Sequence, residues 1–370
     1  MKLNIPKNIA DIIPYPPGKP LEELEREYGI TDSIKLASNE NAWGPSPKAV
    51  AAAQETLSNL HRYPDGSSYH LTQALADWTG AAPEEIVLGN GSNEVIEFLV
   101  KAFVRFGDEV ITSHPSFLMY QKFVQVRGGS NVVIPLKEMN HDLEAIAGAV
   151  TERTRLIFLD NPNNPCATLI SKEDFAAFLT KLPEEVVVVL DEAYIDFVEP
   201  EQRIDVLSLI REPERIPAVV ALRTFSKAFG LSGLRVGFGI MHAEIASLLH
   251  RVRQPFNINL PAQVGALAAL GDTEHYEKTL TGTAACREWL SEQVRQLGCV
   301  PYPSYTNFFL IDVQGDATAL YDAMLYKGVI VRSMKAYSYP NFIRITIGTE
   351  AENQRFVTAL QDCLKELNYV

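Results

Sequence analysis

One lysine in the second half of the chain is surrounded by groups that could do chemistry with it. Lys227 comes just after two hydroxyl residues, Thr224 and Ser226, at the end of an apolar run, and Arg235 follows eight residues later. A primary amine can form a Schiff base with a carbonyl compound, and hydroxyl and guanidinium groups can bind a phosphate. A lysine at the start of a surface helix is the alternative, and this segment alone leaves both interpretations open.

Other polar loops follow apolar runs in the same way. Runs of this kind are typical of parallel strands that are buried on both faces. Open α/β sheets bind ligands outside the carboxyl ends of such strands, so we expect one crevice to collect the loops. The four pairs of run and loop are residues 86–88 with 89–94, 156–159 with 161–165, 186–190 with 191–194, and 218–222 with 224–227.

Each loop can be given a task at a pyridine ring that carries a phosphate. The backbone N–H groups of Ser92 and Asn93 would open a helix and bind an anion there, although the same residues also suit ordinary helix capping. Asp191 would pair with a protonated ring nitrogen, or else cap a turn after its strand. Tyr194 and Asn164 would hydrogen-bond a phenolic oxygen, or else be a packed aromatic and a turn residue. Together with the lysine, these groups are what pyridoxal phosphate needs.

In these motifs the chain resembles the pyridoxal-phosphate-dependent aminotransferases of class II, which have the aspartate aminotransferase-like fold type I. It is most similar to the histidinol-phosphate aminotransferases. The resemblance runs from Tyr15 to Arg344, and its specificity comes from the order and spacing of the motifs together. The matching motifs are residues 36–41 (Leu-Ala-Ser-Asn-Glu-Asn), 62–65 (Arg-Tyr-Pro-Asp), 191–194 (Asp-Glu-Ala-Tyr) and 226–237, which contain Lys227 and Arg235.

The resemblance implies a role for each of these residues. Lys227 would hold the cofactor as a Schiff base and move a proton at the substrate α-carbon, with Asp191 and Tyr194 as the other catalytic residues. The ring of Phe117 would stack on the pyridine, and Tyr63 would reach the phosphate from the other subunit of a homodimer. The cofactor phosphate would be bound by Ser92, Asn93, Thr224, Ser226 and Arg235.

The resemblance also implies a substrate. The expected reaction exchanges an amino group between L-histidinol phosphate and 2-oxoglutarate, giving glutamate, as a step of histidine biosynthesis. The residues expected to contact the substrate are Tyr15, Asn39, Arg332 and Arg344. Before the resemblance is considered, Arg332 could equally be a solvated charge at a strand end.

One turn departs from the family pattern. Where relatives have Asn-Pro-Thr-Gly, this chain has Asn164-Pro165-Cys166-Ala167. The change removes a hydroxyl and the conformational freedom of glycine at a tight turn. Asn164 itself is retained, so the expected function stands. Cys166 is either a reactive thiol near the site or a small filler of the core.

Three other functions fit parts of the pattern. An aromatic amino-acid aminotransferase and a threonine-phosphate decarboxylase would use the same scaffold and the same lysine. A regulator that binds an effector on this fold is a non-enzymatic alternative. Such a regulator usually needs a DNA-binding domain, and an acidic chain that starts almost directly with the arm disfavours it.

Composition narrows the possible partners and compartments. The chain has 370 residues, is 46% hydrophobic and 21% charged, and has a net charge of −13, which argues against general binding to nucleic acids or anionic membranes. It has no apolar run of about 18 residues and no evident secretory signal. Four cysteines without a paired motif are consistent with free thiols in the cytoplasm. Seven scattered histidines predict no metal site.

The pattern of elements predicts the domain organisation. Alternating strands and helices from about residue 64 to 241 indicate an α/β fold with a mainly parallel, doubly wound sheet. Further on we expect helices at 262–270 and 274–297, strands at 307–313, 329–332 and 342–347, and a closing helix at 351–367. The division is then an arm at 1–44 that joins the small domain, a large cofactor-binding domain at 45–255, and an interdomain helix with a small α+β domain at 256–370.

Overall fold

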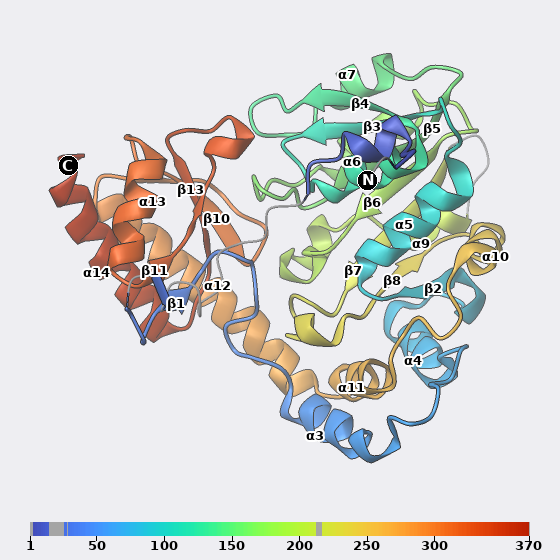
Figure 1. Cartoon of the computed structure of the whole chain (residues 1–370), viewed down its shortest axis with the longest axis horizontal. Helices are drawn as coiled ribbons and strands as arrows, with labels where there is room; N and C mark the ends of the chain where they lie inside the picture. Colours follow the sequence, from blue (N-terminus) through green and yellow to red (C-terminus); the bar gives the residue numbers. More distant parts are fainter. Residues whose placement is uncertain (1–2, 15–25, 28, 212–216, 370) are drawn as a thin grey trace.

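The computed structural model describes residues 3–14, 26–27, 29–211 and 217–369. These residues form two units that are bridged by the long helix α12 (Thr273–Gln296) (Figure 1). Tyr276, near the start of α12, packs against the core of the larger unit, while Leu290 and Val294 lie in the core of the smaller one. The larger unit is built on a seven-stranded, mainly parallel sheet, which confirms the predicted fold class.

The large sheet has the strand order β2-β8-β7-β6-β5-β3-β4. Strands β3 to β7 are parallel, and β8 is antiparallel to both of its neighbours, so β2 again points the same way as the parallel set. The apolar runs of the sequence form strands covered on both faces, where β-branched side chains pack well. The strands are β2 (Ile86–Gly89), β3 (Glu109–His114), β4 (Ser130–Pro135), β5 (Thr154–Asp160), β6 (Val187–Asp191), β7 (Ala218–Thr224) and β8 (Gly237–Ile240).

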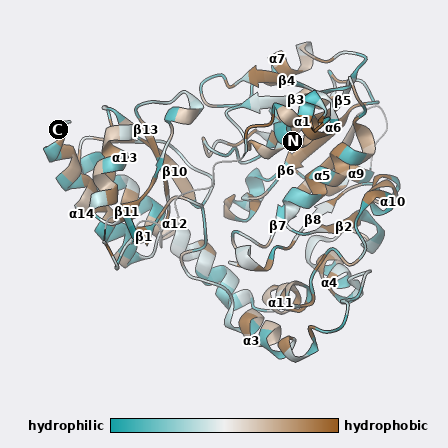
Figure 2. Ribbon diagram, in the orientation of Figure 1, coloured by the Kyte–Doolittle hydropathy of each residue, from teal (hydrophilic) through white to brown (hydrophobic). Residues whose placement is uncertain are grey.

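Helices cover both faces of this sheet and enclose a separate apolar core on each side. Hydrophobic colour runs along several strands of the sheet in Figure 2, as expected for strands between two helical layers. The helices of one face are α5 (Ser92–Phe103), α6 (Met119–Arg127) and α10 (Ala243–Val252). Those of the other are α3 (Pro47–Glu55), α4 (Tyr69–Thr79), α7 (Leu143–Gly148), α8 (Lys172–Leu179), α9 (Val206–Arg211) and α11 (Leu260–Leu270).

The smaller unit has a four-stranded sheet in the order β12-β13-β10-β9 and a separate parallel pair, β1 with β11. The strand expected at residues 329–332 is divided, because β11 joins β1 while β12 joins β13. Its strands are β1 (Ile34–Lys35), β9 (Val300–Pro301), β10 (Phe308–Asp312), β11 (Val329–Ile330), β12 (Arg332–Ser333) and β13 (Phe342–Thr346). Its helices are α13 (Ala317–Tyr326) and α14 (Glu350–Glu366), which lie at the left of Figure 1.

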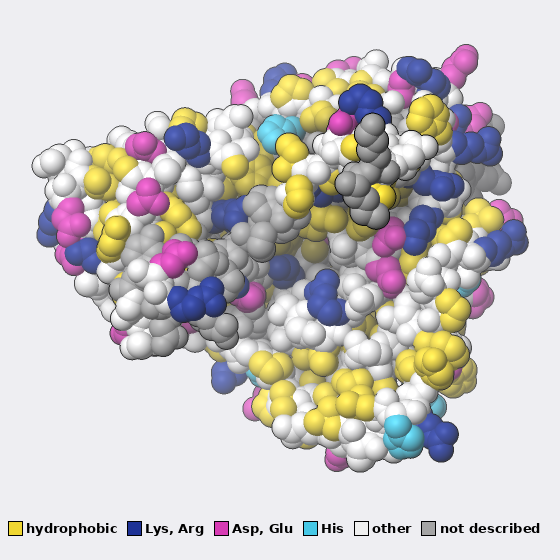
Figure 3. Space-filling view, in the orientation of Figure 1, with side chains coloured by type: hydrophobic (Ala, Val, Ile, Leu, Met, Phe, Trp, Pro, Cys, Tyr) yellow, Lys and Arg dark blue, Asp and Glu magenta, His cyan; other side chains and the backbone are white. Residues whose placement is uncertain are grey.

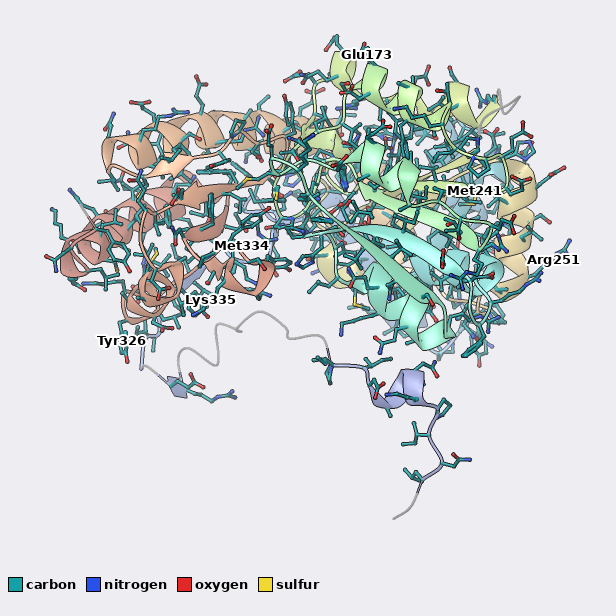
Figure 4. All side chains as sticks on the ribbon, turned by 90° about the horizontal axis from the view of Figure 1, so that it is seen from above. Glu173, Met241, Arg251, Tyr326, Met334 and Lys335 are labelled. Carbon is teal, nitrogen blue, oxygen red and sulfur yellow. The ribbon has the colours of Figure 1, made fainter. Side chains whose placement is uncertain are left out.

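The segment before residue 45 contacts both units. The short helix α1 (Lys7–Ala10) lies against α6 of the larger unit, where Asn8 Nδ2 donates to the carbonyls of Gln125 and Val126 at 3.1 Å each. From β1 onward the segment belongs to the smaller unit. Figure 4 shows α1 beside the larger unit, away from the smaller unit that carries Met334 and Lys335. The boundaries at residues 44 and 255 stay predictions.

Candidate active site

A cavity of about 320 Å³ lies at the carboxyl ends of β5, β6 and β7, and both units contribute to its wall. The space-filling view shows a hollow between the two lobes, with Lys or Arg side chains along it (Figure 3). Tyr63 does not line it, and Tyr15 lies outside the described residues. The predicted site residues that do line it are Asn39, Ser92, Asn93, Phe117, Asn164, Asp191, Tyr194, Thr224, Ser226, Lys227, Arg235, Arg332 and Arg344.

Lys227 lies in the turn after β7 and extends into the cavity. Its Nζ donates to the carbonyl of Asn39 at 3.0 Å and lies 5.5 Å from the centre of the Tyr194 ring. Burial, together with the smaller effect of the positive charge of Arg344, lowers the pKa of Lys227 to about 8. An amine with this pKa has an appreciable neutral, nucleophilic fraction near neutral pH.

Asp191 ends β6 and is held by hydrogen bonds at the base of the cavity. Its Oδ2 accepts from the hydroxyl of Tyr120 at 2.8 Å, and its Oδ1 accepts from the N–H of Ala193 at 3.2 Å. Burial raises the pKa of Asp191 to about 7. A buried carboxylate with a raised proton affinity suits a partner that brings its own positive charge, such as a protonated ring nitrogen.

Tyr194 belongs to a network that connects the two units. Its hydroxyl accepts from Asn39 Nδ2 at 3.0 Å and from Asn164 Nδ2 at 3.4 Å. Arg344, from β13, donates to Asn164 Oδ1 and to the carbonyl of Ala37, and its guanidinium lies 5.0 Å from the centre of the Phe308 ring. Burial raises the pKa of Tyr194 to about 12, so this phenol stays protonated near neutral pH and can act as a donor.

The start of α5 forms one wall of the cavity and is shaped by two glycines. Gly91 precedes the helix with φ of 79°, and a Cβ atom there would lie 2.6 Å from Arg235 Nη2. A Cβ atom at Gly237 would lie 2.3 Å from the backbone nitrogen of Ser92. Only glycine therefore lets the guanidinium and the first N–H groups of the helix come together. Free N–H groups, the helix dipole and a nearby cation favour an anion at this place.

The same wall carries hydroxyl groups that would suit a phosphate group. Thr224 Oγ1 donates to Ser226 Oγ at 3.0 Å and accepts from the Ser226 N–H at 3.1 Å, so both hydroxyls are held beside the helix start. The donor set, the glycines and the buried carboxylate opposite fit the phosphate and the ring nitrogen of pyridoxal phosphate.

Two predicted aromatic residues have different positions. Phe117 lines the cavity and packs edge-on against Tyr120, with ring centres 5.4 Å apart. Tyr63 is 82% exposed and stacks on Phe256 at 4.8 Å, on the surface of its own chain. The predicted action of Tyr63 on another subunit's site stays a prediction.

The turn that departs from the family pattern has a strained backbone at Ala167. Ala167 has φ of 61°, a conformation that glycine adopts freely and alanine does not. Cys166 is buried, and burial raises the pKa of its thiol to about 12. A protonated, buried thiol is unreactive, so the cysteine acts as a filler of the core.

Tyr120 and Asp160 belong to the site and were not predicted from the sequence. Tyr120 is the second residue of α6, and Asp160 ends β5 in the same way as Asp191 ends β6. Both line the cavity. The position of Asp160 after an apolar run was a usable signal, whereas nothing near Tyr120 in sequence points to its partner Asp191.

The described part of the chain has no group of three or more potential ligands that could hold a metal ion. None of its helices has the length and hydrophobicity to cross a membrane.

Comparison with known proteins identifies the family. The family model for aminotransferases of class I and II matches residues 31–360. The chain is 64% identical over its full length to a histidinol-phosphate aminotransferase of Desulfotalea psychrophila, covering 98% of that protein, and 44% identical over 96% of its length to one of Moorella thermoacetica, covering 92%. The crystal structure of histidinol-phosphate aminotransferase from Sinorhizobium meliloti in complex with pyridoxal-5′-phosphate superposes with a TM-score of 0.91, at 28% identity and 99% coverage of both chains. These relatives do not favour a decarboxylase or a regulator. The chain is an aminotransferase and belongs to the histidinol-phosphate aminotransferase family.

Proposed function

We propose that the cavity binds pyridoxal phosphate on Lys227 and exchanges an amino group between L-histidinol phosphate and 2-oxoglutarate. One observation carries this proposal: three features meet in the same cavity. They are the amine of Lys227, whose pKa is lowered, the buried carboxylate of Asp191, whose pKa is raised, and the helix start that favours an anion. Family membership supports the reaction and the substrates.

The residues of the large unit would bind and orient the cofactor. The helix start at Ser92 and Asn93, with Thr224, Ser226 and Arg235, would hold its phosphate, as the geometry of that wall favours an anion. Asp191 would pair with the ring nitrogen. The side chains of Tyr194 and Asn164 would hydrogen-bond the phenolic oxygen, and Phe117 would cover the ring. When bound, pyridoxal phosphate supplies an electron sink for the negative charge that develops at the substrate α-carbon.

Lys227 would act twice, first as the attachment point and then as the base. Once a substrate amine has displaced it, its neutral amine would be free to take the proton from the substrate α-carbon and give it to C4′ of the cofactor. The lowered pKa helps both tasks, because only the neutral form accepts a proton or attacks a carbonyl. The contact with the Asn39 carbonyl keeps the amine on one side of the cavity.

Two arginines of the small unit would recognise the far end of the substrate. A phosphomonoester carries nearly two negative charges, and Arg332 and Arg344 both line the cavity. A planar guanidinium also pairs with a carboxylate, so the same groups would accept glutamate in the other half-reaction. Tyr15 and Asn39 complete the proposed substrate contacts.

The specificity is testable by kinetics. We expect kcat/KM for histidinol phosphate to exceed that for histidine or phenylalanine at least tenfold, which corresponds to about 1.4 kcal/mol. Arg332→Ala should lower kcat/KM for the phosphate substrate more than for phenylalanine. Lys335→Ala, which removes an exposed cation three residues away, is the matched control and should change neither. Equal losses for both substrates in Arg332→Ala would favour an aromatic amino-acid aminotransferase.

The attachment site has its own test. Borohydride reduction of the holoenzyme followed by peptide mapping should place the cofactor on Lys227, and Lys227→Ala should abolish the attachment. Labelling of a different lysine would end this assignment.

We also propose that the enzyme is a cytoplasmic homodimer. Apolar side chains gather over α3 and α11 at the lower edge of Figure 3. In the segment that follows α3 in the chain, Leu57, Leu60 and Tyr63 are more than half exposed. Exposed apolar patches of this kind are typical of protein interfaces. All four cysteines are free, which suits a reducing compartment.

A further inference from the structure

We propose that Asp160 is a second carboxylate for the ring nitrogen of the cofactor, a positioning residue that acts through Asp191. The inference rests on the proposed function, because it requires pyridoxal phosphate in the cavity. It assigns a role to a residue that ends β5 and that no motif of the sequence singled out.

The two carboxylates are neighbours in the sheet. Asp160 and Asp191 are paired in register at the ends of β5 and β6, and adjacent strands lie about 4.8 Å apart. In-register residues of adjacent strands point to the same face, and both side chains line the cavity. Asp160 is 3% exposed and Asp191 is 5% exposed, so little water separates or screens them.

Three hydrogen-bond donors contact Asp160. Its Oδ1 accepts from Asn163 Nδ2 at 3.0 Å, and its Oδ2 accepts from the N–H of Asn164 at 2.9 Å. His141 Nε2 lies 3.3 Å from Oδ1 and 3.0 Å from the carbonyl oxygen of the same residue. Because a carbonyl oxygen only accepts, this nitrogen carries a proton and faces the carboxylate as a donor.

The hydrogen-bond partners of Asp191 are all neutral among the described residues. Asp191 receives neutral donors, the Tyr120 hydroxyl and the Ala193 N–H, and no cation pairs with it among the described residues. The pKa of Asp191 is raised mainly by burial, and the negative charge of Asp160 raises it too. A proton shared between Asp191 and a ring nitrogen satisfies both carboxylates at once, and Asp160 makes that proton harder to remove.

A purely structural role predicts something different. Asp160 also holds the backbone of Asn164, whose side chain contacts Tyr194 and Arg344. If this were its only role, removing its charge would disturb any ligand that occupies the cavity. If it acts on the ring nitrogen, the effect depends on whether that nitrogen is present.

The experiment compares two ligands of the apo-protein by calorimetry. One is pyridoxal phosphate, and the other is 1-deazapyridoxal phosphate, in which a C–H group replaces the ring nitrogen. We expect Asp160→Asn to weaken binding of pyridoxal phosphate at least fivefold more than binding of the deaza analogue. Asn161→Ala disturbs the same turn by removing the acceptor of the Ile170 N–H, and it leaves both charges and the donors of Asp160 in place, so it should weaken the two ligands equally.

Equal weakening of both ligands by Asp160→Asn would overturn the inference and leave only the structural role. If that variant does not fold, Asp160→Ser is used, because its hydroxyl still accepts from Asn164 without a charge. Failure of both variants to fold would also overturn the inference, since an electrostatic partner is dispensable for folding. Failure of the wild-type protein to bind pyridoxal phosphate would instead refute the proposed function.

Discussion

At the scale of single residues, burial moves the pKa values of a lysine and an aspartate, which carry opposite charges, toward neutral pH. The pKa of Lys227 is lowered to about 8 and that of Asp191 is raised to about 7, and burial is the main cause in each case. Both shifts cost stability, since each group would prefer its charged form in water. Such a cost is typical of active sites. Here the proposed function requires a neutral lysine that attacks a carbonyl group and a buried carboxylate that binds a positively charged ligand group.

The lowered pKa of Lys227 predicts how fast the apo-protein takes up its cofactor at different pH. The attacking species is the neutral amine, so below about pH 8 the rate should fall about tenfold for each pH unit. Above that pH the rate should level off, well before an ordinary lysine with a pKa of about 10.4 would. Stopped-flow absorbance of pyridoxal phosphate mixed with apo-protein measures this rate, and Lys227→Ala is the control without attachment. A rate that keeps rising to pH 10 would contradict the prediction.

At the scale of elements, the sequence predicts which strands are buried but not what they pair with. The apolar runs before Asp191 and Thr224 form the expected strands, and their polar loops line one cavity. The antiparallel β8 and the division of residues 329–332 between two sheets depend on partners far away in the chain. Tyr120 was not predicted because its partner is also distant in the chain: Asp191 lies 71 residues away. Side-chain patterns in the sequence indicate which segments are buried, whereas tertiary contacts decide which strands and side chains meet.

The turn after Asn164 offers a stability test at this scale. Ala167 has φ of 61°, where a Cβ atom is strained and glycine is not. Ala167→Gly should therefore raise the free energy of unfolding by about 1 kcal/mol, less the extra entropy that glycine gives the unfolded chain. The midpoint of thermal unfolding of the apo-protein measures the change.

A matched control for that substitution is Ala145→Gly, at an exposed position inside α7. The helical backbone there has no strain to relieve, so this variant should lose about 1 kcal/mol. A loss of stability in both variants would show that the turn carries no strain at Ala167.

At the scale of the whole molecule, the proposed dimer would complete the site. Tyr63 stacks on Phe256 at the surface, and a two-fold interface over this surface would present it to the cavity of a second copy. Each of the two sites would then contain residues from both chains.

Mixing two inactive variants tests this arrangement. We expect Tyr63→Phe to be impaired, because it loses the hydroxyl and keeps the ring, and Lys227→Ala to be inactive. After subunit exchange, each mixed dimer should contain one intact site, so random exchange should restore about a quarter of wild-type activity. Exchange is verified by mass spectrometry of the native dimer. Verified mixed dimers without regained activity would show that Tyr63 does not act across the interface.

The antiparallel strand also sets the order in which the molecule can be completed during synthesis. Among the described residues, the sole strand partner of β2 in the large sheet is β8, and the register joins Ile86 to Ile240 and Gly89 to Gly237. The five parallel strands can associate as they emerge, whereas β2 has no strand to join until β8 has left the ribosome. The start of α5 contacts Arg235 and Gly237 only after β8 has been made. The proposed phosphate-binding wall is therefore among the last parts of the large unit to form. Until that moment the nascent chain exposes an unpaired strand edge, and an unpaired edge can pair with another chain and aggregate.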